Sequence, residues 1–360
     1  MNSRFLPSCK KALRPLAVLL LLAPVFALGQ TAVSSWSLSN SNAGNSSAYG
    51  GYNFDNQTNT ISSITVGGNV RSISSTADAV YVRRAGTASG TGDTAGGANI
   101  WEVATSSSNL LGTNTSASTI QNVLLGHNAL MGANDVFTNT GGTPSQVNNN
   151  IERIDYVWNS AFTAISDQGF AVFDRALNHD AADGFQIAVF TGWDSSTNRP
   201  TTYSGNVVQV NAGSGSQYSA NGLDWDPTTG GTQSSFGYQI LRFTNGDNLS
   251  PLDTADGYIN GQGIFGVYIS FADLGIPQGT TVYGYSLMAT DVTNNVARLA
   301  DWTNASYYPT DTSDSIGSID FLGVNGRRYV PEPSTYGALL LGSVGAFLGL
   351  RRWRRLARAV

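Results

Sequence analysis

Residues 266–291 read GVYISFADLGIPQGTTVYGYSLMATD, and this stretch decides the fold class. Within it and just before it, apolar side chains recur at every second residue in two separate runs. A period of two is typical of β-strands with one buried face. The glycines and the proline between the runs predict a tight turn. The apolar positions are Phe265, Val267, Ile269 and Phe271 in the first run and Tyr283, Tyr285, Leu287 and Ala289 in the second.

The same period recurs upstream at Ile154, Tyr156 and Trp158. No long helical period appears, which disfavours architectures that alternate strands with helices. The sequence therefore predicts an all-β fold, namely an antiparallel β-sandwich of jelly-roll type. The further predicted strands cover residues 169–173, 185–190, 207–210 and 238–243, with glycine- and asparagine-rich turns between them.

The predicted ectodomain spans residues 30–329 and changes composition near its middle. Residues 30–150 are a low-complexity part rich in Ser, Thr, Asn and Gly, and residues 151–329 form the main sandwich. A short helix is predicted at 119–125, because Ile120, Val123 and Leu124 share one face. The strand-like pieces of the first part are 61–66, 80–83 and 100–103.

Segments of this body resemble known bacterial sequences. The rhythm of residues 266–291 is similar to that of late strands in some bacterial carbohydrate-binding sandwiches. The segments NIERIDYVW and GFAVFDR resemble parts of uncharacterised bacterial surface domains. Neither resemblance implies an activity.

Charges are sorted along the chain of 360 residues, whose net charge is -5. Lysines occur only at positions 10 and 11, and five arginines lie within the last ten residues. The body between them is acidic, which disfavours a nucleic-acid partner. The single cysteine, Cys9, precedes the body, so the predicted mature protein forms no internal disulfide.

Residues 1–29 have the basic and apolar segments of a secretory signal peptide in their usual order, with an apolar signal helix. Lys10, Lys11 and Arg14 form a basic start, and an apolar run follows from Leu16 to Leu28. A membrane-spanning helix is the alternative, although the run is short and contains Pro24. The expected partners here are signal peptidase and the secretion machinery.

Residues 330–360 have three parts in a fixed order. Pro331, Glu332 and Pro333 form a motif within residues 330–335, an uncharged apolar segment covers 336–350, and a basic end covers 351–360. We expect a single transmembrane helix at 336–350, with the basic end in the cytoplasm. The basic end contains Arg351, Arg352, Arg354 and Arg355.

This three-part order resembles the PEP-CTERM sorting signal of bacterial surface proteins. The resemblance implies recognition by an exosortase, removal of the tail, and delivery to the cell surface or extracellular matrix. An ordinary single-span membrane anchor is the alternative interpretation of the same residues.

The body offers few residues for catalysis. The only histidines are His127 and His179, and there is no Gly-x-Ser-x-Gly motif, so a hydrolytic triad and a zinc site are disfavoured. Glu152 lies beside Arg153 in a strand of alternating pattern, and a place on a solvated face is a simpler interpretation than a catalytic role. We therefore expect a non-catalytic ectodomain, with a secreted hydrolase as the least favoured alternative.

Three loops, at 178–184, 224–231 and 245–257, have the composition of a calcium site, in which Asp, Asn and backbone oxygens surround a hard cation. Aspartate and asparagine also favour turns by bonding to their own backbone, and this second interpretation stays open. The candidate metal ligands are Asp180, Asp183, Asp247, Asp253 and Asp256.

Three tryptophans beside aspartates are candidates for sugar binding: Trp193, Trp225 and Trp302. A core role for each is the alternative, because large aromatic side chains are most often buried. The sequence thus favours a secreted surface or matrix protein, and its alternative is a carbohydrate-binding module held in extracellular polysaccharide.

Overall fold

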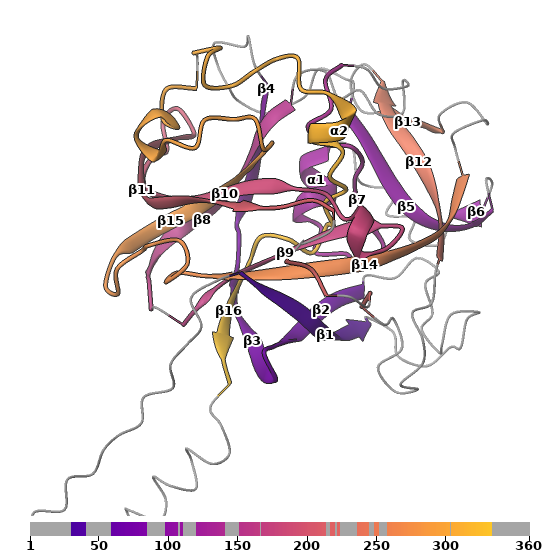
Figure 1. Cartoon of the computed structure of the whole chain (residues 1–360), viewed down its shortest axis with the longest axis horizontal. Coiled ribbons are helices and arrows are strands. Elements are labelled where there is room, and N and C mark those ends of the chain that lie inside the picture. The colour runs from indigo at the N-terminus through magenta and orange to yellow at the C-terminus, as the bar shows by residue number, and fades with distance from the viewer. Residues whose placement is uncertain are drawn as a thin grey trace, which may run out of the picture.

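The computed structural model describes residues 30–40, 59–84, 98–106, 109–110, 120–140, 151–165, 167–213, 217–219, 222–223, 236–244, 248–251, 258–302 and 304–332. This part of the chain is mostly β and forms two antiparallel sheets (Figure 1). The prediction of an all-β fold with antiparallel sheets is confirmed. The predicted signal helix, the apolar segment 336–350 and the basic end lie outside the described residues. Among the residues described, none of the helices combines the length and apolar character needed to span a bilayer.

The smaller sheet has five strands in the order β11-β10-β15-β8-β4. Its outer surface is covered by the chain that follows β15, and the short 3-10 helix η2 (Val296–Arg298) lies in that chain. The strands are β11 (Arg199–Val210), β10 (Phe185–Asp194), β15 (Thr281–Met288), β8 (Ile151–Thr163) and β4 (Ala79–Arg84).

The larger sheet runs in the order β1-β2-β3-β16-β9-β14-β12-β5-β6, with β7 beside β5 and β13 beside β12. Because β1 also pairs with β14, the first six strands of this order form a closed ring. The ring strands are β1 (Thr31–Asn40), β2 (Asn59–Val66), β3 (Asn69–Thr76), β16 (Arg327–Pro331), β9 (Gly169–Ala176) and β14 (Tyr258–Ser270). The others are β12 (Phe236–Thr244), β5 (Ala98–Ser106), β6 (Asn109–Leu110), β7 (Met131–Ala133) and β13 (Asn248–Pro251).

Strand β9 is buried along its whole length because it separates two hydrophobic cores. Phe170 and Val172 belong to the core between the two sheets, whereas Ala171 and Phe173 face the core inside the ring. Its partner β14 alternates in the same way and crosses the middle of the molecule (Figure 1). A strand buried on both faces carries apolar side chains without alternation, as parallel strands covered by helices do.

The two strands predicted from residues 266–291 exist but belong to different sheets. The first is the end of β14, and the second is β15, which pairs with β8 and β10. The turn after Phe271 therefore carries the chain from one layer to the other. Gly266 lets the ring core close, because a Cβ there would lie 2.7 Å from a Phe173 ring carbon.

The N-terminal part is integrated into both sheets. Residues 30–150 supply β1, β2 and β3 to the ring and β4 to the smaller sheet, so the composition change near residue 150 marks no boundary between sheets. The predicted helix is confirmed as α1 (Ile120–Leu125), with Ile120, Val123 and Leu124 buried.

Candidate functional site

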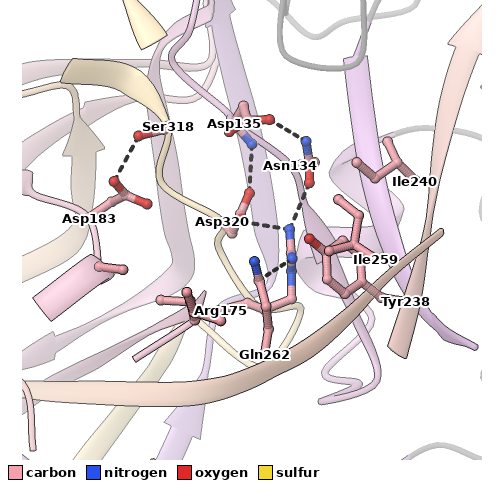
Figure 2. Close-up of a pocket in the computed structure, with 13 residues that line it drawn as sticks. Asn134, Asp135, Arg175, Asp183, Tyr238, Ile240, Ile259, Gln262, Ser318 and Asp320 are labelled. Carbon is pink, nitrogen blue, oxygen red and sulfur yellow. Dashed lines mark hydrogen bonds and ion pairs between the residues drawn. The ribbon is translucent and has the colours of Figure 1, made fainter. Parts of the chain in front are cut away.

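A pocket of about 440 Å³ opens where the ends of several strands meet beside the ring. Its polar side chains come from segments far apart in the sequence (Figure 2). Arg175 lies on β9, Tyr238 on β12 and Gln262 on β14, and Asn134 follows β7. Asp183 precedes β10, and Asp320 follows the short helix α2 (Asp314–Gly317).

Arg175 is the centre of this pocket. Its guanidinium donates to Asp320 Oδ2 at 2.5 Å, to Asn134 Oδ1 at 2.7 Å and to Gln262 Oε1. The guanidinium carbon lies over Tyr238, 3.5 Å from the ring centroid, which adds a cation–π contact. Arg175 is only 2% exposed, and these partners fix its side chain in one orientation.

Four aspartates surround this arginine. The carboxylate of Asp174 accepts from the backbone N–H of Asp320 at 2.9 Å and of Asp183 at 2.8 Å. The carboxylate of Asp320 accepts from the backbone N–H of Asp135 at 2.8 Å, and Ser318 Oγ donates to Asp183 Oδ1 at 2.7 Å. These bonds connect three loops and hold the acids in place, and Figure 2 shows the bond between Asp135 and Asp320 and the bond between Ser318 and Asp183.

Burial keeps part of this acidic group protonated near neutral pH. It raises the pKa of Asp320 to about 7, against the opposing attraction of Arg175. It also raises the pKa of Asp183 to about 6, against the bond from Ser318. The pKa values of Asp135 and Asp174 are raised mainly by burial and then by neighbouring carboxylates. The pocket therefore combines one fixed cation with acids that can exchange protons.

The structure brings together only part of the predicted calcium loops. Asp183 lies in the pocket, Asp180 is exposed on the 3-10 helix η1 (His179–Ala181), and the candidates Asp247, Asp253 and Asp256 lie outside the described residues. Across the ranges that the structure describes, no group of three or more His, Cys, Asp or Glu side chains is arranged to hold a metal ion.

Of the predicted sugar-binding tryptophans, the two that the structure describes, Trp193 and Trp302, do not line the pocket. Trp302 is 5% exposed and packs edge-on against Tyr308 in the core, so it offers no open face to a sugar ring. Trp193 is half-buried at the end of β10, stacked on Phe190 with ring centroids 5.7 Å apart. The third candidate, Trp225, lies outside the described residues.

The interpretation of Glu152 as part of a solvated face is wrong. Its relative exposure is 0%, and burial, followed by repulsion from Asp291, raises its pKa to about 9. Strand alternation places it on the same face of β8 as the core residues Ile154 and Tyr156. Neighbouring charged residues in a strand pattern suggest an exposed face. Here the prediction fails because both faces of the strand are covered.

The central residues of the pocket were missed by reasoning from sequence. Asp174 and Arg175 directly follow the predicted strand at 169–173, and Asp320 stands alone in SIDFLG. One signal could have found them: the charged pair Asp174 and Arg175 directly continues an uninterrupted apolar strand, which suggests that both charges are buried. The partners themselves are 145 residues apart, which no local pattern links.

We expect stability to fall as pH rises from about 4 to about 7. Asp320 and Asp183 have raised pKa values, so the folded protein holds more protons than the unfolded chain in this window. For Asp320 alone the loss between pH 5 and pH 7.5 is on the order of 2–3 kcal/mol. Urea unfolding of the full-length chain at pH 5 and 7.5 measures it, with Asp320→Asn expected to flatten the dependence. Equal stability at the two pH values would contradict the assignment.

Comparison with protein-family models, with characterised proteins and with solved structures finds no match for this chain.

Proposed function

We propose that this chain is an exported bacterial surface or matrix protein, with a tail that an exosortase removes. The support is the order of residues 330–360: the Pro331, Glu332 and Pro333 motif, the apolar segment and the arginine-rich end. Export and attachment precede removal, so the ectodomain faces the outside of the cytoplasmic membrane.

The contacts of the motif fit removal of the tail from a folded domain. Pro331 is the last residue of β16 and lies opposite Arg71 of β3. The backbone N–H of Glu332 donates to Val70 O at 3.2 Å, and its carboxylate accepts from Ser72 Oγ. Cleavage after these residues would leave every strand of the ring intact.

Replacing Pro331, Glu332 and Pro333 together by alanine should keep the precursor in the membrane, because the proposed protease loses its recognition motif. Intact mass and membrane fractionation of the protein from its own host measure this. The matched control is Ser72→Ala, which removes the contact to Glu332 and leaves the motif unchanged. Mature surface protein that still contains residues 356–360 would refute removal of the tail.

We further propose that the ectodomain is non-catalytic and binds polysaccharide in the pocket around Arg175. The observation that carries this proposal is the set of lining groups: carboxyl, amide and guanidinium groups beside the Tyr238 ring, in about 440 Å³. Saccharides are bound by such polar groups together with an aromatic face. Because acids outnumber the one arginine, neutral or amino sugars fit better than uronic acids.

The finer fold remains part of the same proposal. A jelly-roll sandwich is supported by the core between the smaller sheet and the β9–β14 pair, which resembles the interior of two packed sheets. The closed ring of six strands is an addition to that plan.

Binding of chitosan oligosaccharides to the full-length chain tests the pocket, with alginate as the anionic counterpart. We expect the amino sugar to bind and Asp135→Asn to weaken binding about tenfold, the effect of one lost hydrogen bond to the charged amino group of the sugar. Gln209→Ala lies outside the pocket lining and is the control. Unchanged affinity in Asp135→Asn, or a preference for alginate, would contradict the proposal.

A secreted hydrolase is the second candidate, favoured by one observation. Asp183 and Asp320 both line the pocket and have pKa values of about 6 and 7, which suit proton exchange near neutral pH. The same incubation separates the candidates. Release of new reducing ends that disappears in Asp320→Asn indicates hydrolysis, and binding without release indicates a binding domain.

A further inference from the structure

Three buried oxygen atoms without a hydrogen-bond donor lie near the start of β8, apart from the pocket around Arg175. They are Asn139 Oδ1, Glu152 Oε2 and Asp291 Oδ1. Asn139 is 8% exposed and Glu152 is 0% exposed. Buried polar atoms are normally paired, because an unpaired one loses its water without compensation. Three unpaired acceptors in one place indicate that a positively charged group binds between them.

Hydrogen bonds bring the three side chains together. Asn139 Nδ2 donates to Glu152 Oε1 at 2.7 Å, which directs the amide toward the carboxylate. The backbone N–H of Asn139 donates to Thr312 O at 2.8 Å, and Thr312 Oγ1 donates to Asp291 Oδ2 at 2.9 Å. One oxygen of each carboxylate is thus held by the protein, and the other oxygen remains available.

The topology explains why these residues meet. Glu152 is the second residue of β8, and Asp291 follows the end of β15, which pairs with β8 from Met288 opposite Arg153. The chain around Asn139 reaches the same place through a parallel bridge between Thr140 and Ser313. Two carboxylates are close enough for Asp291 to raise the pKa of Glu152 by repulsion.

We propose that Glu152, Asp291 and Asn139 bind a calcium ion. Ca²⁺ accepts carboxylate and amide oxygens at about 2.3–2.6 Å and completes its six to eight ligands with water and backbone carbonyls. Mg²⁺ requires a tighter octahedral shell, and Zn²⁺ favours nitrogen and sulfur ligands, which this group lacks. The site consists of two acids and one amide, and it shares no residue with the acidic loops predicted from the sequence.

A dication satisfies all three unpaired oxygens at once, whereas a proton on Glu152 satisfies at most one neighbour. A site with only two carboxylates belongs to the class of extracellular modules with dissociation constants of about 10⁻⁴–10⁻³ M. Its occupancy would then depend on the calcium concentration outside the cell.

Isothermal titration of the full-length chain with CaCl₂ at pH 8 tests the proposal. We expect one equivalent to bind, and the melting temperature to rise by several degrees at one hundred times the dissociation constant. Glu152→Gln and Asp291→Asn should each reduce the affinity at least tenfold. Asp180→Asn, an exposed acid from a predicted calcium loop, is the matched control and should bind like the wild type.

The outcomes are distinct even where a variant folds poorly. Wild-type protein that binds no calcium at pH 8 overturns the proposal, whatever the variants do. Binding that survives in both Glu152→Gln and Asp291→Asn also overturns it and places calcium elsewhere. Loss of binding in folded Glu152→Gln, with unchanged binding in Asp180→Asn, supports the site.

Discussion

Replacing Asp155 by asparagine should lower the free energy of unfolding by about 3–5 kcal/mol, because two buried guanidinium groups lose their shared counter-charge. Arg83 Nε lies 2.7 Å from Asp155 Oδ2, and Arg153 Nε lies 2.8 Å from Oδ1. All three side chains are at most 2% exposed, so water cannot replace the lost carboxylate. The attraction of the two arginines lowers the pKa of Asp155 despite its burial.

Neutral groups complete the hydrogen bonding around Asp155 and Arg153. Ser286 Oγ donates to Asp155 Oδ1 at 2.6 Å, and Arg153 Nη1 donates to Leu299 O at 2.8 Å and to Tyr308 Oη at 2.7 Å. The cluster therefore fastens the chain after β15 to the smaller sheet. Loss of Asp155 should loosen this connection as well as destabilise the sheet.

Urea unfolding of the full-length Asp155→Asn chain at pH 7 measures the effect. Asp194→Asn is the matched control, because Asp194 is on the same sheet and bonds only within its own turn to Ser196 and Thr197. We expect the control to change stability by less than about 1 kcal/mol. A change of that size in Asp155→Asn would show that the buried charges are compensated in another way.

Replacing Arg175 by glutamine should destabilise the protein by about 3–5 kcal/mol at pH 7.5 and by much less at pH 5. Without the guanidinium, Asp320 and Asp135 lose the attraction that lowers their pKa values, and both values rise further. The folded protein then binds protons that the unfolded chain releases above about pH 4. Stability of the variant must therefore fall more steeply with rising pH than that of the wild type.

Unfolding midpoints of Arg175→Gln at pH 5 and 7.5 test this sign. Arg298→Gln is the control, because Arg298 is exposed on η2 and contacts Tyr307 through the face of its ring. The control should lose equally little at both pH values. If Arg175→Gln loses the same stability at pH 5 and at pH 7.5, Arg175 does not control the pKa values of the acids in the pocket.

Local pattern was enough to predict the type of most elements. The alternation at Phe265, Val267 and Ile269 predicted a strand, and the shared face of Ile120, Val123 and Leu124 predicted the helix that is present. Side-chain period depends on backbone geometry within one element, so it can be recognised without the rest of the fold. Because this period describes one element at a time, it said nothing about which strands pair.

The candidate site was hidden for a related reason. Arg175 meets Asp320 only because β9 and the loop after α2 converge, and Glu152 is buried only because both faces of β8 are covered. In the sequence each of these residues has the neighbours of a solvated strand end. Most of the arginines whose burial the structure describes are in fact buried, among them Arg83, Arg153 and Arg175.

The sequence by itself determined the all-β class and the acidic character of the body. It also determined the order of basic, apolar and motif segments in residues 1–29 and 330–360. Composition and short periods carry these properties. The tertiary structure alone decided that β1 meets β14 and closes a ring, that β9 serves two cores, and that acids from distant loops gather around Arg175. The physical reason is that strand pairing and burial depend on contacts between residues far apart in the chain. Their strength comes from excluding water on both sides of a strand, which no single segment of sequence can express.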